Sequence, residues 1–565
     1  MRGGSEGVGV QAASVTELLT GAVRGALVTA GLPAPASVGW EAPRDPRHGD
    51  YATNVALTLA KPARKAPRQI AEALVRHFPA SPAVDRVEVA GPGFVNVFLA
   101  PGWCAEALAQ ILDAGAAYGA SDVERGRAYR LEFVSANPTG PLVIVSARAA
   151  AVGDALARIL RAQGARVARQ YYVNDAGQQF RALAASYAVR LRQAQGEAAE
   201  LPDSAYPGEY LIDLARERLD RDAAGARAIL ALPEAEALEQ LGREAVTAMV
   251  DGQRRVLEDY GAVFEEWVHE AADVRDRDLP ARAIAALTAA GHTYEHEGAL
   301  WFRSTAFGDD KDRVLRKSDG ELTYFAVDIG FHHFLKFAGV DHVIDFLGPD
   351  HHGYVPRITA AMRALGYGEG SFDVMIVQLV TLLRDGQPVR MSKRRGEFVL
   401  MEELLEEVGR DAARFTFLTR RHDSPLEFDL ALATRHSADN PVFYVQYAHA
   451  RVASLRRTAA EQAVVVPDWG AVDFSVLVLP EEQLLIKRLL QFPDMLAGAA
   501  RAREPHRVAY YLSELAALFH PYYKAHRVIT GDRGLTLARL GLATAVGQVV
   551  RNGLGLLGVS APESM

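Results

Sequence analysis

Cysteine and positive net charge are both scarce in this sequence. Of 565 residues only Cys104 is a cysteine, which excludes a disulfide within the chain and a zinc site built mainly from cysteine. The 62 Lys and Arg residues against 70 Asp and Glu residues give a net charge of −8. This balance excludes a protein that holds nucleic acid by bulk charge, but it leaves room for local basic patches.

Long apolar runs are missing as well. We find no run of 18 apolar residues, so we expect no membrane span. The opening MRGGSEGVGVQAAS lacks the basic and apolar blocks of a signal peptide. We therefore expect a cytoplasmic protein.

Hydrophobic residues make up 49% of the chain, enough for several cores, and the length predicts about three or four domains at ~150 residues each.

A strand, a turn and a helix follow one another early in the chain. Residues 131–134 are apolar and predict a buried strand, residues 137–141 form a Gly/Pro turn, and residues 147–161 predict an Ala-rich helix. Such a unit brings backbone N–H groups to a phosphate. A second strand at residues 166–173, followed by Asn174, makes it a βαβ unit with polar residues at the strand end, where such sheets bind ligands.

The rest of the chain divides by periodicity and charge. Residues 1–125 predict a small α+β domain with a helix at 15–30 and two strands within 87–99. The charge-laced range 178–290 predicts amphipathic helices, which we interpret as an insertion between sheet strands. Strand candidates return at 299–304, 342–347 and 373–379, and from 401 onward the pattern is nearly all helical.

Three groups of residues have the types needed for nucleotide chemistry. The basic turn at 389–396, which contains Arg390, Ser392 and Lys393, can neutralise charge on a leaving pyrophosphate, although most such clusters are solvated surface. Tyr324 and Asp328 share a face if their segment is helical.

Asp328 and Glu132 could together hold a cation, for which a guanidinium is a strong candidate; a salt bridge or a helix cap explains Asp328 equally well. Asp350 and His351 follow a predicted strand, and with no further ligands to place we favour hydrogen bonds to a nucleotide over zinc.

Aromatic and basic residues alternate in the last part of the chain. Tyr447, His449 and Arg451 belong to this pattern, and exposed aromatic rings beside arginine can stack on unpaired bases. A helical core with a polar rim would give the same composition. For Phe94 and Asn96, ordinary strand chemistry is favoured over an RNA contact by the local sequence alone.

Taken together, these segments resemble the arginyl-tRNA synthetases of bacterial type, which are class I aminoacyl-tRNA synthetases. The resemblance covers nearly the whole length and is carried by several long motifs: GDYATN (49–54), GPGFVN (91–96), EFVSANPTGPL (132–142), YYVNDAGQQ (171–179), GPDHHGYVPR (348–357), MSKRRGEFV (391–399) and DNPVFYVQYAHAR (439–451).

The resemblance implies a fold and a reaction. It implies an N-terminal domain at 1–125 that reads the tRNA D-loop, a Rossmann-type α/β catalytic domain at 126–435 with its helical insertion, and an all-α anticodon-binding domain at 436–565. The expected enzyme is a monomer. It activates arginine with ATP and Mg²⁺ to arginyl-adenylate and transfers the arginyl group to its tRNA, and it needs no zinc. In this family the first step usually requires bound tRNA.

The resemblance also implies roles residue by residue. The arginine substrate would be held by Glu132, Ser135, Asn137, Asn174, Tyr324 and Asp328. The ATP side would include Pro141, Leu142, Val143, Val145, Ser146, Asp350, His351, Met391 and Lys393. Lys393 matches the second lysine of the KMSKS signature, and Arg390 replaces the first lysine. Phe94 and Asn96 would face the D-loop, and Tyr447, His449 and Arg451 the anticodon.

The sequence departs from the family at the start of the predicted helix. Where the family has its HIGH signature, this chain has Val143, Ile144, Val145 and Ser146. Both imidazole donors are absent, and Val145 puts a branched side chain where the glycine lets the nucleotide approach. Losing each transition-state donor costs roughly 3 kcal/mol, about a hundredfold in rate. We therefore predict impaired activation.

A second hypothesis is a tRNA-binding protein without ligase activity, either a degenerate paralogue or an inactivated variant. The intact arginine pocket and Lys393 loop favour a recent or engineered change over long decay. Another class I synthetase or nucleotidyltransferase is disfavoured by the pair of Glu132 and Asp328.

Overall fold

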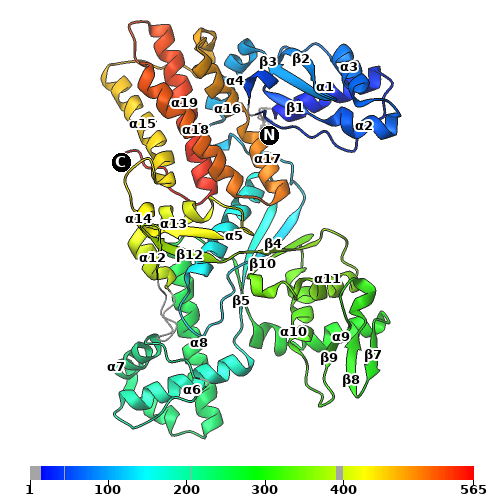
Figure 1. The fold of residues 1–565 in the computed structure, drawn as a ribbon. Coiled ribbons are helices and arrows are strands. Elements are labelled where there is room, and N and C mark those ends of the chain that lie inside the picture. Colours follow the sequence, from blue (N-terminus) through cyan, green and yellow to red (C-terminus); the bar gives the residue numbers. More distant parts are fainter. Residues whose placement is uncertain (1–13, 44, 204, 390–398) are drawn as a thin grey trace, which may run out of the picture.

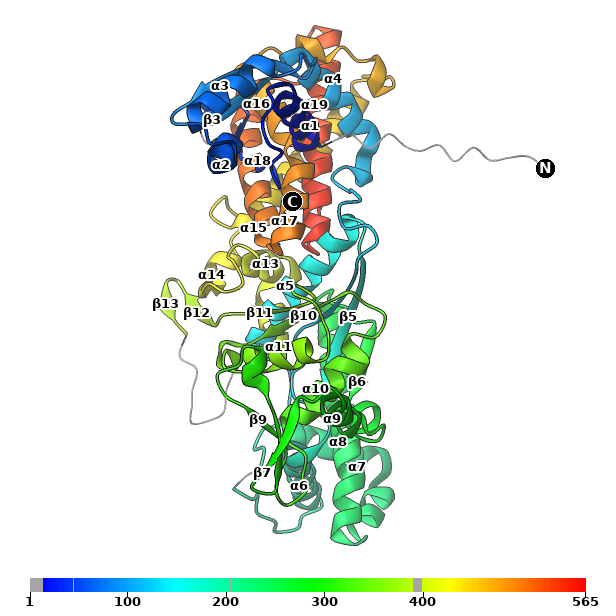
Figure 2. The same cartoon turned by 90° about the vertical axis from the view of Figure 1, so that its right-hand side faces the viewer.

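The computed structural model describes residues 14–43, 45–203, 205–389 and 399–565. The molecule is elongated: the N-terminal part and the C-terminal helices lie at one end, and the inserted helices lie at the other (Figures 1 and 2). Among the helices of these four ranges, none is long and apolar enough to cross a membrane.

The N-terminal part is a small antiparallel sheet packed against helices. Its strands β1 (Tyr51–Thr53), β3 (Phe94–Leu99) and β2 (Val84–Ala90) lie in that order. Val95 packs in one core with residues of α1 (Val15–Thr29), α2 (Val55–Ala63) and α3 (Pro67–His77). Helix α4 (Pro101–Ala114) then packs against α16 (Pro480–Leu490) and α19 (Arg533–Leu556) of the C-terminal part.

A five-stranded parallel sheet forms the centre of the molecule. Its order is β11 (Phe372–Ile376), β10 (His342–Leu347), β4 (Ala128–Glu132), β5 (Arg166–Val173) and β6 (Glu266–His269). The chain runs outward from β4 through β5 to β6 and later returns to the other side of β4 with β10. The order therefore reverses between β4 and β10, and ligands of open α/β sheets bind at the strand ends beside this switch point.

Helix α5 (Ile144–Ala162) connects β4 to β5 and is almost wholly buried. It begins three residues before the predicted start because the Ile144 N–H donates to the Val399 carbonyl, at 3.2 Å, an interaction the local sequence does not reveal. At Gly153 the helix passes so close to Phe133 that an added Cβ would lie 2.4 Å from the ring. A small residue is therefore required there.

The inserted helices are α6 (Gly177–Ala194), α7 (Tyr210–Leu230) and α8 (Glu234–Asp259), the teal-to-green group in Figure 1. The range predicted to consist of amphipathic helices, 178–290, also contains β6, which joins the central sheet. That part of the prediction is wrong, because four residues of strand are too short to stand out against the helical periodicity around them.

The remaining elements complete the central part and form the C-terminal helices. Helices α9 (Leu279–Ala289), α10 (Tyr324–Phe331) and α11 (Val355–Ala364) lie with a second small sheet of β7 (Thr293–His296), β8 (Ala299–Phe302) and β9 (Arg313–Arg316). A third small sheet follows, made of β12 (Val380–Arg384), β13 (Gln387–Pro388) and β14 (Leu426–Asp429). The short helices of this region are α12 (Met401–Val408), α13 (Arg410–Phe417) and α14 (Leu430–Ala433). The chain ends in the C-terminal helices α15 (Pro441–Glu461), α16, α17 (Phe492–Ala502), α18 (His506–Ala525) and α19.

Replacing Gly153 by alanine tests the close packing of α5. We expect Gly153→Ala to lower the free energy of unfolding by about 1–3 kcal/mol through overpacking against Phe133. Gly25→Ala in α1 is the matched control: a Cβ there meets nothing within 4 Å, so the helix gains propensity without a clash. Urea denaturation measures both, and equal effects of the two variants would contradict this packing.

Candidate active site

Acidic and polar side chains gather where the parallel strands end. Glu132 is the last residue of β4 and is paired in register with Asp345 of β10 and Gln170 of β5. Asn174 follows β5, Glu270 follows β6, and Asp350 lies just past β10. These residues lie at the carboxyl edge of the sheet, around the switch point.

A buried lysine forms ion pairs with two of these carboxylates. Lys336 is 2% exposed, and its Nζ lies 2.5 Å from Oε2 of Glu132 and 2.6 Å from both carboxylate oxygens of Asp345. His332 also contacts Asp345, with 2.9 Å from Nε2 to Oδ2. Burial opposes ionisation of Asp345, but Lys336 and His332 outweigh it and lower the pKa of Asp345 to about 2. Glu132 therefore already has a cationic partner.

Asp328 lies on α10, one turn after Tyr324, as the spacing predicted. Burial raises the pKa of Asp328 to about 6, despite the opposing effects of His332 and of a hydrogen bond from Tyr354. In the described part of the chain, no ion pair includes Asp328. Tyr324 is 65% exposed, and its hydroxyl lies 3.7 Å from the position of a Cβ added to Gly177, at the start of α6.

Glu270 is an acidic residue of this site that the sequence analysis missed. It is 3% exposed and accepts hydrogen bonds from the Tyr172 hydroxyl, at 2.8 Å, and from Arg275 Nε, at 2.7 Å. Burial raises the pKa of Tyr172, and the charges of Glu270, Asp328 and Glu132 raise it further, so all three carboxylates lie around this phenol. Recognising β6 would have pointed to Glu270, which directly follows it.

The turn after β4 contains two strained residues and is held by hydrogen bonds from β5 and α8. Val134 and Ser135 have φ values of 69° and 38°, rare for residues with a side chain, and such strain concentrates at functional sites. The Ser135 hydroxyl accepts from the Tyr172 N–H, at 3.0 Å. From α8, Gln253 Nε2 donates to the Gly140 and Asn137 carbonyls, at 2.8 and 3.2 Å. The Asn137 side chain is exposed, and that of Asn174 is partly buried.

The start of α5 carries the altered tetrapeptide. Val143 precedes the helix, provides no side-chain cap, and forms an isolated β-bridge with Leu400. Val145 packs against the main core, and Ser146 is 9% exposed. Leu142 is buried, whereas Pro141 is exposed. The Leu142 carbonyl accepts a hydrogen bond from the Met401 N–H at 2.8 Å. The helix start thus has valine methyl groups at two positions and one largely buried hydroxyl.

Other predicted ATP residues lie beside or beyond this region. Asp350 and His351 are largely exposed, and the His351 Nε2 lies 3.4 Å from Asp350 Oδ2. Arg390, Met391, Ser392 and Lys393 fall outside the described residues. The chain resumes at Val399, which bonds to Ile144 at the start of α5. Among the residues that the structure describes, no group of three or more His, Cys, Asp and Glu side chains is placed to hold a metal ion.

The predicted RNA-contacting residues differ in exposure. The Arg451 guanidinium lies 4.3 Å from the centre of the Tyr447 ring and 5.3 Å from that of Tyr523, and Tyr447 is 37% exposed. His449, by contrast, is 7% exposed, and its Nδ1 donates to the Pro562 carbonyl at 2.9 Å. On β3, Phe94 is partly buried and Asn96 is 5% exposed. His449 and Asn96 are thus largely covered by protein.

Removing the buried lysine tests the electrostatics of this site. We expect Lys336→Met to destabilise the fold by about 3–5 kcal/mol, because Glu132 and Asp345 are left buried with an uncompensated charge. Lys317→Met, which breaks the exposed pair with Glu321, should leave the urea midpoint unchanged. Similar midpoints for the two variants would show that Lys336 does not hold these carboxylates.

Three family models match successive parts of the chain. The arginyl tRNA synthetase N-terminal domain matches residues 15–99, the catalytic domain of class I (R) tRNA synthetases matches 107–424, and the DALR anticodon binding domain matches 445–565. The matches follow the three parts seen in Figure 1.

Relatives and solved structures agree with these models. The chain is 47% identical to an arginine–tRNA ligase of Desulfosudis oleivorans over 96% of this chain and 97% of that protein. It is 48% identical to one of Syntrophotalea carbinolica over 93% and 94%. The arginyl-tRNA synthetase structure of Thermus thermophilus superposes with a TM-score of 0.76 at 26% identity and covers 98% of this chain and all of that one. The chain belongs to the arginyl-tRNA synthetase family of class I aminoacyl-tRNA synthetases.

Proposed function

We propose that this protein is an arginine–tRNA ligase whose activation step is impaired by its altered tetrapeptide. The observation that carries the proposal is the group of buried carboxylates at the switch point of a sheet in a chain of this family. In the first step the arginine carboxylate attacks the α-phosphate of ATP, giving arginyl-adenylate and pyrophosphate. In the second, a ribose hydroxyl of the terminal adenosine of tRNA(Arg) attacks the arginyl carbonyl and releases AMP.

Asp328 is the carboxylate best suited to the guanidinium. It is partly buried and is hydrogen-bonded by Tyr354, and among the described residues no basic side chain forms an ion pair with it, although His332 and Lys336 lie close enough to lower its pKa. Glu132 is already matched by Lys336, so we assign it a secondary part in balancing the charge of the bound substrate. Glu270 also raises the pKa of Asp328, but its carboxylate is paired with Arg275 at 2.6 Å, so we assign it a secondary part as well.

The remaining expected contacts fit around this pocket. Ser135 and Asn174 lie at the ends of adjacent strands, and the exposed Tyr324 and Asn137 are suited to close on a bound substrate. On the ATP side we retain Pro141, Leu142, Val143, Val145, Ser146, Asp350, His351, Arg390, Met391, Ser392 and Lys393 as proposed contacts. Magnesium would be held by the ATP phosphates and would offset their charge.

We propose different roles for the residues predicted to contact tRNA. The layer of Tyr447, Arg451 and Tyr523 is the type of surface on which unpaired bases stack. His449 would instead support α15 against the C-terminal tail. Phe94, which is partly buried, would contact the D-loop from the N-terminal domain at 1–125, and the largely covered Asn96 would support β3. The catalytic and anticodon-binding domains would lie at 126–435 and 436–565. We propose that the enzyme acts as a monomer in the cytoplasm.

The alternative is a tRNA-binding protein without ligase activity. One observation favours it: the start of α5 presents valines where the family presents imidazole donors. The intact acidic pocket favours the ligase, because a protein that only bound tRNA would have no use for buried carboxylates beside the ATP region.

Restoring the tetrapeptide tests the impaired step. We expect the variant Val143→His, Val145→Gly, Ser146→His to increase arginine-dependent ATP–pyrophosphate exchange, with tRNA(Arg) present, by at least about a hundredfold over the parent. The control Val143→Leu, Val145→Gly, Ser146→Leu adds side-chain volume without donors and should stay slow.

Two other outcomes decide against the proposal. A parent chain that already matches the restored variant would show that the tetrapeptide does not limit activation. If neither chain exchanges but both bind tRNA(Arg), the binding-protein alternative is correct.

Asp328 predicts a pH dependence for arginine. Its pKa is raised to about 6, so the carboxylate is neutral below that pH and charged above it. We expect the KM for arginine to rise roughly tenfold per pH unit as pH falls below about 6, because the guanidinium loses its partner. Asp328→Asn should raise KM at pH 7 and flatten this dependence, while Asp319→Asn on an exposed turn should leave it unchanged. An unchanged profile in Asp328→Asn would assign the titration to another group.

A further inference from the structure

The turn that follows β4 is held by two side chains of the inserted helices. Gln253 of α8 donates from Nε2 to the Asn137 carbonyl at 3.2 Å and to the Gly140 carbonyl at 2.8 Å. Tyr210, the first residue of α7, donates from its hydroxyl to the Thr139 carbonyl. Three carbonyl groups of one turn therefore bind donors that lie 71 to 116 residues further along the chain.

The Gln253 side chain is fixed by hydrogen bonds on both sides of its amide. It is 2% exposed, and its Oε1 accepts from the Tyr171 hydroxyl at 2.7 Å. That hydroxyl in turn accepts from the Ala136 N–H at 3.1 Å. Tyr171 is wholly buried and stacks on Trp267 with ring centres 4.3 Å apart. Because both partners of Gln253 Nε2 are carbonyl groups, which can only accept, the orientation of the amide follows from its partners.

Tyr210 reaches the turn because Gly140 has no side chain. A Cβ added to Gly140 would lie 3.3 Å from the Tyr210 hydroxyl oxygen, which is tight, and one added to Gly208 would lie 2.0 Å from the Tyr210 ring. Burial raises the pKa of Tyr210 to about 12, so the hydroxyl keeps its proton at neutral pH. It therefore remains a donor to the Thr139 carbonyl.

These donors hold a conformation that costs free energy. Val134 and Ser135, directly before the hydrogen-bonded carbonyls, have positive φ, and such strain persists only where surrounding contacts impose it. The Asn137 side chain is exposed, so its direction depends mainly on the backbone that carries it. Gln253 binds the carbonyl of that same residue.

We propose that Gln253 and Tyr210 are positioning residues of the amino-acid site, through which the inserted helices hold the turn so that Asn137 faces bound arginine. The inserted helices are then a working part of the arginine site. Without these donors a smaller fraction of molecules has the turn in its binding conformation, and the apparent Kd for arginine rises by the inverse of that fraction. The inference rests on the proposed function in that Asn137 contacts the arginine substrate.

Equilibrium dialysis of radiolabelled L-arginine tests this without catalysis, so the altered tetrapeptide does not limit the measurement. We expect Gln253→Met, which keeps the side-chain length but removes both donors, to raise the Kd about tenfold, and Tyr210→Phe to raise it about threefold. Gln163→Met is the matched control: Gln163 is wholly buried just past the end of α5, and its Nε2 donates to the Gly119 carbonyl at 3.0 Å. It should lower the urea midpoint, as Gln253→Met does, but leave the Kd unchanged.

A double-mutant cycle shows whether Gln253 acts through Asn137. If it does, Gln253→Met changes the Kd of the Asn137→Ala chain by less than about twofold, because the side chain that it positions is already absent. If the two residues act separately, their effects on the Kd multiply. A side chain that only stabilises the fold would give the second result.

The outcomes separate this inference from the proposed function. Gln253→Met that folds and binds arginine like the parent overturns the inference and leaves the proposed function standing. An equal rise of the Kd in Gln163→Met, multiplying effects in the cycle, or Asn137→Ala that binds like the parent does the same. If Gln253→Met does not fold, Tyr210→Phe and its own cycle with Asn137→Ala decide. A parent that does not bind arginine, with or without tRNA(Arg), overturns the proposed function and this inference with it.

Discussion

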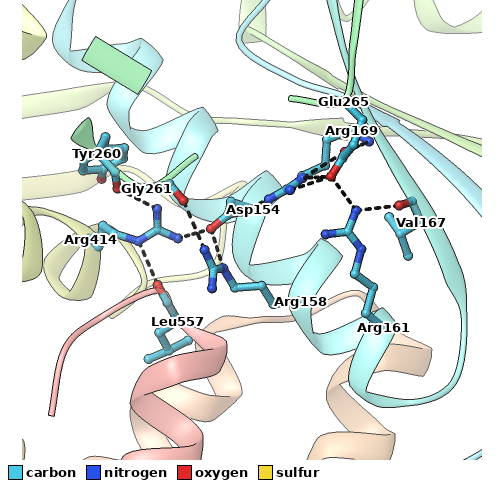
Figure 3. Close-up of polar contacts among 10 residues, drawn as sticks. All are labelled: Asp154, Arg158, Arg161, Val167, Arg169, Tyr260, Gly261, Glu265, Arg414 and Leu557. Atoms are coloured by element: carbon cyan, nitrogen blue, oxygen red, sulfur yellow. Dashed lines mark hydrogen bonds and ion pairs between the residues drawn. The ribbon is translucent and has the colours of Figure 1, made fainter. Parts of the chain in front are cut away.

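One buried carboxylate, Asp154, connects the main parts of this molecule. It holds arginines from α5, β5 and α13, and through Arg414 it reaches the last turn of the C-terminal helices (Figure 3). Removing a charge from water is costly unless its partners are close and well oriented, so the arginines cannot drift from their positions without a large loss. The sheet, the helix that leads from it and the C-terminal domain are thereby fixed in one arrangement.

At the switch point, unlike at Asp154, one carboxylate has no ion-pair partner among the described residues. Lys336 forms ion pairs with both Asp345 and Glu132, whereas Asp328 forms none in the described part of the chain, and burial raises its pKa to about 6. A carboxylate in that state is ready to gain from a guanidinium that enters the pocket. The pocket therefore combines two carboxylates that share one lysine with a third that has no ion-pair partner among the residues that the structure describes, and this excess of negative charge is what our proposal assigns to a cationic side chain such as arginine.

The sequence predicted local elements well and long-range contacts poorly. Strands β5 and β10 were predicted to the residue, and Tyr324 and Asp328 lie on a helix, the condition under which they were expected to share a face. The start of α5 was placed three residues late because its first N–H pairs with Val399, far along the chain. The Lys336 partner of Glu132 and the site residue Glu270 were missed for related reasons: a salt bridge between distant segments leaves no periodic pattern, and β6 is only four residues long.

We propose that this protein combines an intact amino-acid pocket with a deficient ATP region, and a transfer assay that bypasses ATP tests this combination most directly. Chemically prepared arginyl-adenylate and tRNA(Arg) are mixed with the parent and with the tetrapeptide-restored variant, and the single-turnover rate of arginyl-tRNA formation is measured. We expect transfer rates within about threefold of each other, although the ATP-driven reaction differs by about a hundredfold or more. If transfer by the parent is slowed as much as its ATP-driven reaction, the defect lies outside the ATP contacts and the proposal is wrong.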